Sequence, residues 1–233
     1  MILKVFAISD LHLSINSNKP MDIFGPVWEN YLEDIEESWN QLVSDDDIVL
    51  IAGDISWAMH FKDAVADLDY ISRFKGHKIL IRGNHDYWWK GISGLRADLP
   101  NKVYALQNDA IKIGDVIICG TRGWVVPETT HKSADDEKIY KREAIRLELS
   151  LKSAKTLREN NEKIICMIHY PPFNSKVEDS DYTSLMEQYG VDCVVYGHLH
   201  SYDKKQKLVV EKNNIKYYLT SCDLVKNKLV EII

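Results

Sequence analysis

The chain has 233 residues, of which 45% are hydrophobic and 27% charged. These values are typical of a globular protein with one large core, and they exclude a collagen-like or largely disordered chain. Twenty-nine basic residues against 35 acidic residues give a net charge of −6, which argues against general attraction to nucleic acid or anionic membranes. We expect one domain over residues 1–233, in which an anionic ligand needs a local positive charge.

The termini and the cysteines indicate the cellular compartment. The first nine residues are apolar, but Asp10 ends this run before a signal peptide is complete, and no apolar run approaches the length of a membrane span. The four cysteines are far apart in the sequence, form no CxxC motif, and lie in or just after apolar runs. We therefore expect buried, reduced thiols and a cytoplasmic protein. The cysteines are Cys119, Cys166, Cys193 and Cys222.

The first third of the chain alternates predicted strands and helices. A strand over residues 2–9 precedes a helix over 26–43, whose apolar residues recur at intervals of three and four. A strand over 47–52, a helix around 61–71 and a strand over 78–82 follow. This order predicts parallel strands joined by right-handed crossovers.

The rest of the chain is richer in strands. Gly114 and Asp115 predict a hairpin turn, and a polar stretch leads to one long amphipathic helix ending near residue 160. The last thirty residues are typical of antiparallel strands with a turn at 212–214. The other predicted strands cover residues 103–106, 110–113, 116–120, 163–168 and 191–196. Together these elements predict an α/β fold.

Polar side chains follow five of the predicted strands. In open α/β sheets, ligands bind beyond the carboxyl ends of strands. A single His or Asp in such a place usually forms a turn or cap. Five of the eight histidines, two aspartates and an asparagine at these ends are too many for that explanation. These residues are Asp10, His12, Asp54, Asn84, His85, His169, His198 and His200.

This residue set predicts metal binding. Imidazole, carboxylate and amide groups without thiolate suit Mn, Fe, Zn or Ni, and the set is too large for one tetrahedral ion. Two divalent ions with Asp10, Asp54 and a bridging hydroxide would keep a net charge of about +1 and attract an anion. Such an ion pair activates water near neutral pH and stabilises an in-line displacement. Phosphoester hydrolysis is the reaction that fits best.

The same residues resemble the motifs of the calcineurin-like metallophosphoesterase family. The family pattern of D-x-H, GD, GNH[DE], a lone His and GHxH is present in order between residues 10 and 200. The resemblance implies a four-layer α/β/β/α sandwich of two mixed sheets flanked by helices. It also implies a hydrolase of small-molecule phosphomono- or phosphodiesters that uses two divalent metal ions.

The resemblance further implies a role for each residue. Asp54 would bridge the two ions, and His85 would contact the phosphate and protonate the leaving oxygen, a task suited to imidazole. Asn84 would also contact the substrate, and Arg122 is a candidate for holding a second phosphate. Asp86 would order its loop. One ion would be held by Asp10, His12 and His200, and the other by Asn84, His169 and His198.

The sequence departs from one branch of the family. Protein serine/threonine phosphatases carry GDxxDRG, whereas here Gly53-Asp54 continues to Met59 without the arginine. This favours a small-molecule substrate. A nuclease and a catalytically silent, metal-binding interaction scaffold are the alternatives, and the acidic composition argues against the nuclease. Four tryptophans would either stack a nucleobase or simply pack, and packing is the commoner role. They are Trp57, Trp88, Trp89 and Trp124.

Overall fold

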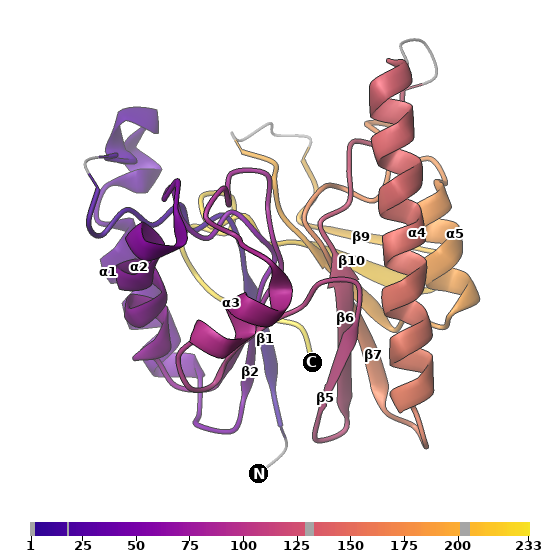
Figure 1. Cartoon of the computed structure of the whole chain (residues 1–233), viewed down its shortest axis with the longest axis horizontal. Coiled ribbons are helices and arrows are strands. Elements are labelled where there is room, and N and C mark those ends of the chain that lie inside the picture. The colour runs from indigo at the N-terminus through magenta and orange to yellow at the C-terminus, as the bar shows by residue number, and fades with distance from the viewer. Residues whose placement is uncertain (1–2, 18, 129–132, 201–205) are drawn as a thin grey trace.

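The computed structural model describes residues 3–17, 19–128, 133–200 and 206–233. Two β-sheets pack face to face, and helices cover the outer face of each sheet (Figure 1). The strand order is β11-β1-β2-β3-β4 in the first sheet and β5-β6-β7-β8-β10-β9 in the second. Both sheets mix parallel and antiparallel pairs, so the predicted four-layer α/β/β/α sandwich is confirmed.

The first sheet consists mainly of parallel strands from the first half of the chain. The predicted parallel order is confirmed, because β1 pairs with β2, β2 with β3 and β3 with β4 in parallel. Every residue of β1 and β2 is buried, since both faces of the sheet are covered. The strands are β1 (Val5–Ile8), β2 (Ile48–Ile51), β3 (His77–Leu80), β4 (Val103–Ala105) and the antiparallel β11 (Val230–Glu231).

The second sheet has a parallel centre and two antiparallel edge strands. The predicted hairpin at Gly114 joins β5 to β6, and Gly114 has a φ of 59°. Strands β6, β7, β8 and β10 are parallel neighbours. The strands are β5 (Ala110–Ile113), β6 (Val116–Thr121), β7 (Lys163–Ile168), β8 (Cys193–Tyr196), β9 (Val209–Lys212) and β10 (Ile215–Leu219).

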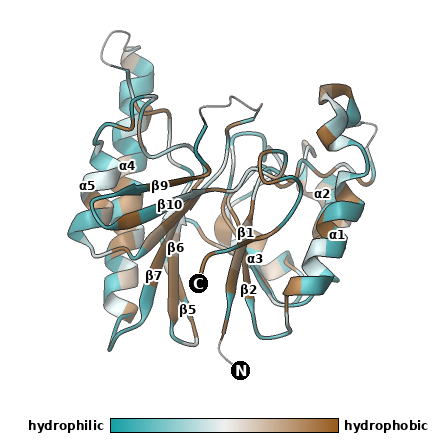
Figure 2. Ribbon diagram, turned by 180° about the vertical axis from the view of Figure 1, so that it is seen from behind, coloured by the Kyte–Doolittle hydropathy of each residue, from teal (hydrophilic) through white to brown (hydrophobic). Residues whose placement is uncertain are grey.

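The helices form the two outer layers. The first sheet is covered by α1 (Tyr31–Leu42), α2 (Phe61–Ser72) and α3 (Ile92–Asp98), and the second by α4 (Ala134–Leu157) and α5 (Asp181–Gln188). The hydropathy colours of Figure 2 show apolar sheets between helices with polar outer faces. Among the described residues, no helix has both the length and the apolar character needed to cross a membrane.

Three apolar clusters hold the layers together. One lies between the two sheets, and one lies between each sheet and its helices. All four cysteines are buried and unpaired within these layers, as the sequence analysis predicted.

The predicted helix over 26–43 is shorter than expected. Residues Pro26–Trp28 form a 3₁₀ turn, η2, that follows another 3₁₀ turn, η1 (Asp22–Phe24). Asn30 then adopts a left-handed conformation with a φ of 53°, and the α-helix begins only at Tyr31. Because the chain reverses at Asn30, Trp28 packs edge-on against Tyr31 with ring centroids 5.2 Å apart.

Two short helices and one strand pairing were missed. Helix α3 has seven residues and contains Gly94, and α5 has eight residues, so neither shows a long periodic pattern. The predicted antiparallel pairing is confirmed for β9 and β10, whose turn at Asn213 and Asn214 has positive φ angles. Strand β11 is also antiparallel, but its partner is β1 in the other sheet.

Candidate metal centre

The candidate residues lie in loops at the carboxyl ends of strands in both sheets. Asp10, His12, Asp54 and His198 adopt left-handed backbone conformations, with φ angles between 47° and 71°. Non-glycine residues rarely occupy this region unless neighbouring contacts hold them there. Here the Asp10 N–H donates to the carbonyl of Gly53, and the His12 N–H donates to that of Asp54. The loops after β1 and β2 therefore fix one another.

Two glycines let these loops approach closely. A Cβ on Gly83 would collide with the carboxylate of Asp54, and a Cβ on Gly197 would collide with that of Asp10. The glycines of the GNH and GHxH motifs are thus needed because each lies directly against a carboxylate of the site.

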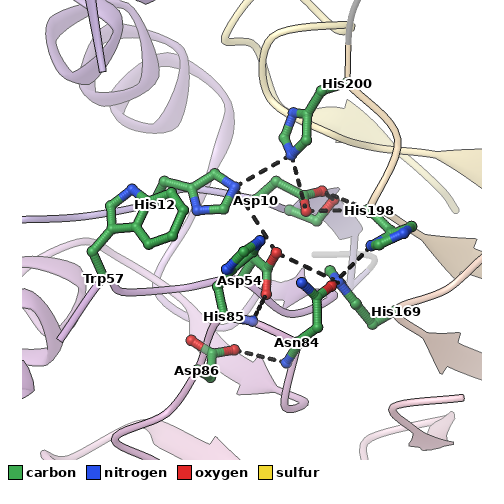
Figure 3. Close-up of polar contacts among 12 residues, drawn as sticks. Asp10, His12, Asp54, Trp57, Asn84, His85, Asp86, His169, His198 and His200 are labelled. Carbon is green, nitrogen blue, oxygen red and sulfur yellow. Dashed lines mark hydrogen bonds and ion pairs between the residues drawn. The ribbon is translucent and has the colours of Figure 1, made fainter. Parts of the chain in front are cut away.

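Asp10, His12 and His200 form one group of possible ligands. Their ligand atoms all lie within 4.8 Å of one another. The His12 Nε2 atom is 3.3 Å from His200 Nε2, and His200 Nε2 is 3.8 Å from Asp10 Oδ1 (Figure 3). Backbone and side-chain donors hold the Asp10 carboxylate in place, since it accepts from Ser9 Oγ at 2.7 Å and from the His198 N–H at 3.0 and 3.1 Å.

A second group surrounds Asp54 and Asn84. Asp54 Oδ2 lies 3.5 Å from His169 Nε2 and 3.9 Å from His12 Nε2, so this carboxylate faces both groups. The amide oxygen of Asn84 is 2.7 Å from His169 Nε2 and 2.9 Å from His198 Nδ1. Figure 3 shows these side chains pointing toward one another from both sheets. Asp10, Asp54 and His169 also form a possible ligand group of their own.

The electrostatics of the site favour cation binding. Burial is the main cause that lowers the pKa of His12 to about 2 and that of His169 and His198 to about 3, so these imidazoles are neutral near pH 7. Burial also raises the pKa of Asp10 to about 7, with Asp54 adding to the effect and His200 opposing it. Burial lowers the pKa of His200, but Asp223 and Asp10 outweigh it and raise that pKa, so His200 offsets part of the charge of the two buried carboxylates. A divalent cation would supply further positive charge.

Two histidines are oriented by partners outside the ligand groups. The ring nitrogen Nδ1 of His169 lies 2.9 Å from the carbonyl of Ala52, and Nδ1 of His200 lies 3.1 Å from Asp223 Oδ1. If Nδ1 carries the proton in each ring, Nε2 is left with its lone pair facing the site. Histidines that bind metals are oriented in this way by carbonyl or carboxylate partners. The residues present therefore fit metal ions.

His85 lies beside these groups. Its backbone N–H donates to Asp54 Oδ1 at 2.8 Å, and its half-buried ring lies 5.7 Å from the ring of His12. It belongs to neither ligand group. Trp57 contacts both histidines, since its ring stacks on His12 at 4.6 Å and tilts against His85 at 4.6 Å.

Asp86 orders the loop that carries Asn84 and His85. Its fully buried carboxylate accepts hydrogen bonds from the N–H groups of Ile55, Ser56 and Gly83 and from Trp88 Nε1, at 2.7 to 3.2 Å. The loops after β2 and β3 are thereby joined through one side chain.

The side chains of the other predicted substrate contacts are held by residues outside the ligand groups, although the Arg122 backbone contacts His169. Arg122 faces the buried carboxylate of Glu143 at 3.8 Å, and its carbonyl accepts from the His169 N–H at 3.0 Å. Trp88 and Trp89 are buried in the core, so packing explains them. Trp124 packs on Tyr170 and donates to Asp136.

Asp223 is a site residue that the sequence analysis missed. It follows β10, so it also stands at a strand end, and that position was the available signal. The sequence analysis considered β10 only as part of an antiparallel ending and therefore did not inspect the residues that follow it. Because β10 runs parallel to β8, its carboxyl end lies at the same edge of the sheet as that of β8.

Comparisons with known proteins show the family and the fold. A family model described as calcineurin-like phosphoesterase matches residues 3–202. The solved structure of TT1561 of Thermus thermophilus has a TM-score of 0.62 and 12% identity, covering 100% of this chain and 99% of that chain. A protein of unknown function from Aquifex aeolicus has a TM-score of 0.52 and 15% identity, covering 98% and 95%. No curated protein matches. At these identities the two structures show the fold alone.

Proposed function

The chain belongs to the calcineurin-like phosphoesterase family, and from that premise we propose that it is a dinuclear, metal-dependent hydrolase of small-molecule phosphomono- or phosphodiesters. The observation that carries the proposal is the Asp54 carboxylate, which faces both the group of Asp10, His12 and His200 and the cluster around Asn84. One ion would be held by Asp10, His12 and His200, and the other by Asn84, His169 and His198. Asp54 would bridge them, because its Oδ2 faces both His12 and His169.

Two divalent ions bound there would supply activation of water near neutral pH and stabilisation of the negative charge that develops on the phosphoryl oxygens. The protein's own contribution begins with charge. The neutral imidazoles of His12, His169 and His198 would leave the positive charge of the ions uncancelled, while Asp10 and Asp54 supply only two negative charges. The site would then attract a phosphate ester although the chain as a whole is acidic.

His85 would serve as the general acid. It lies beside the ligand groups and belongs to neither, so its ring is available to the substrate. The hydrogen bond from its backbone to Asp54 fixes its distance from the bridging carboxylate. A proton donated from this imidazole to the leaving oxygen would prevent the build-up of negative charge on the departing alcohol.

The test is hydrolysis of bis(p-nitrophenyl) phosphate and p-nitrophenyl phosphate with added Mn²⁺. We expect turnover that a chelator abolishes and that returned Mn²⁺ restores. Asp54→Asn should lower kcat by about 100-fold or more, because it removes the charged carboxylate that would bridge the two ions. Asp69→Asn is the matched control, since Asp69 is exposed on α2.

Metal analysis on the same samples separates the alternatives. Near-wild-type turnover by Asp54→Asn would contradict the bridging role. Two ions per chain without turnover on any phosphoester would instead favour a metal-binding interaction scaffold. Salt-sensitive cleavage of single-stranded DNA or RNA would favour a nuclease.

A further inference from the structure

A cavity of about 720 Å³ opens beside the candidate metal centre. His12, His85 and His200 form one wall, so any group in the cavity would lie next to the residues that we place around the phosphate. The remaining walls come from Trp57, from residues 21 and 24–28, and from the segment after β10. The cavity borders the candidate ligand group, with which it shares His12 and His200, and most of its lining lies outside that group.

The walls away from the histidines are mostly apolar. They include Phe24, Val27, Trp28, Trp57 and Leu224. The two tryptophans connect this surface to the metal centre, because Trp57 stacks on His12 and Trp28 lies 6.0 Å from the ring of His200. The apolar surface therefore begins directly at the candidate ligands.

Part of this apolar surface is open to solvent. Phe24 is 63% exposed and Val27 36% exposed, although both line the cavity. Exposed apolar side chains gathered around a cavity beside a candidate catalytic residue are typical of a ligand-binding site. Burying them against an apolar group would be favourable.

The polar groups of the cavity are few. Away from the three histidines, the charged lining residues are Asp223, which pairs with His200, and Lys226. These few groups offer a nucleobase or a sugar little hydrogen bonding in exchange for its contacts with water, which disfavours both. An alkyl or aryl group has no such requirement.

We propose that this cavity binds an apolar alkyl or aryl ester group of the phosphoester substrate. The inference rests on the proposed function and specifies its substrate class. The phosphate would lie at the metal centre, and the hydrocarbon group would extend between the tryptophans and residues 24–27.

The proposal is tested with three alkylphosphonates, which are not hydrolysed and carry one organic group each. These are ethylphosphonate, hexylphosphonate and 2-(2-hydroxyethoxy)ethylphosphonate, the last having the length of the hexyl compound but two oxygens. Their Kd values are measured by calorimetry on the Mn²⁺-loaded protein. We expect hexylphosphonate to bind about tenfold or more tighter than the other two, because only its chain gains from burial.

A matched pair of exposed residues provides the control. Phe24 lines the cavity, whereas its neighbour Ile23 is 73% exposed and is not part of the lining. Phe24→Ser should reduce the ratio of the ethylphosphonate Kd to the hexylphosphonate Kd by about threefold or more, and Ile23→Ser should leave the ratio unchanged. Thermal unfolding confirms that both variants fold.

Equal affinity for the hexyl compound and its polar counterpart would overturn the proposal, as would equal effects of the two substitutions. Failure of the proposed function looks different. In that case bis(p-nitrophenyl) phosphate is not hydrolysed at all, whereas calorimetry still reports whether the cavity prefers a hydrocarbon chain.

Discussion

At the scale of single residues, some side chains of the candidate site are possible metal ligands, and others contact or orient those ligands. Asp10, His12 and His200 place their ligand atoms within 4.8 Å of one another. His85 stands next to them with a different set of contacts, a backbone hydrogen bond to Asp54 and a ring contact with Trp57. Asp223 contacts the site through His200. These differences in contact predict different consequences of substitution.

Substitution of His85 should separate catalysis from metal binding. We expect His85→Asn to lower kcat by about 10²–10⁴-fold, because the leaving oxygen loses its proton donor. The metal content should stay at the wild-type value, since His85 belongs to neither ligand group. Steady-state kinetics and elemental analysis of one preparation measure both. Loss of metal would mean that His85 is a ligand.

Substitution of Asp223 should weaken metal binding without removing a ligand. Asp223→Asn keeps the shape of the side chain but removes the charge that faces His200 Nδ1. We expect the affinity for Mn²⁺ to fall by about 10–100-fold, which titration of the metal-free protein measures. Asp69→Asn again serves as the control. An unchanged affinity would show that Asp223 does not orient His200.

At the scale of elements, hydrogen bonds join neighbouring loops to one another and a strand to a helix. The Asp86 carboxylate joins the loop after β3 to the loop after β2 through hydrogen bonds with Ile55 and Gly83. Elsewhere, Lys78 of β3 joins strand to helix. Its ammonium group donates to the carbonyls of Ser72, Phe74 and Gly76, at the C-terminal end of α2.

This helix-end contact predicts a pH dependence of stability. Burial lowers the pKa of Lys78 from 10.5 to about 8 in the folded protein. Between these two pH values the unfolded chain binds more protons at this group, so its contribution makes the free energy of unfolding rise with pH. Across this pH range, the free energy of unfolding of the wild-type protein should rise by on the order of 1–3 kcal/mol relative to that of Lys78→Met.

Urea unfolding measures that difference at about pH 7.5 and about pH 10, which lie near the pKa of Lys78 in the folded protein and in the unfolded chain. Lys62→Met is the matched control, because Lys62 is exposed on α2. A difference between wild type and Lys78→Met that does not change with pH would contradict the expected titration.

At the scale of the whole molecule, the candidate centre lies where the two sheets meet. Asp10, Asp54 and Asn84 follow strands of the first sheet, whereas His169 and His198 follow strands of the second. Metal ions held by both sets would connect the two sheets. Metal binding should therefore stabilise the fold as well as support catalysis.

Removal of metal should lower the Tm. An ion present at about 100 times its Kd adds about 2.7 kcal/mol to the free energy of unfolding. For a chain of this size this corresponds to a decrease in Tm of about 5–10 °C on chelation. Differential scanning calorimetry measures it, and Asp54→Asn should show a smaller decrease. Identical Tm values with and without chelator would show that ions do not connect the sheets.

The sequence by itself determined the fold class and pointed to the candidate site. Continuous apolar runs marked the buried strands, and a parallel strand places the residue after its carboxyl end at a common edge. Asp10, Asp54, Asn84, His169 and His198 could therefore be grouped before any coordinates were known. Short-range periodicity carries this information, because it reflects which faces of an element are buried.

Only the tertiary structure decided how distant segments meet. It placed β10 and β11 in different sheets, brought Asp223 to His200, and joined residues 21–28 to the segment after β10 around one cavity. Local sequence did not predict these pairings, because a short apolar strand fits either sheet. The position of β11 and the walls of the cavity depend on packing between segments about two hundred residues apart, which no local pattern contains.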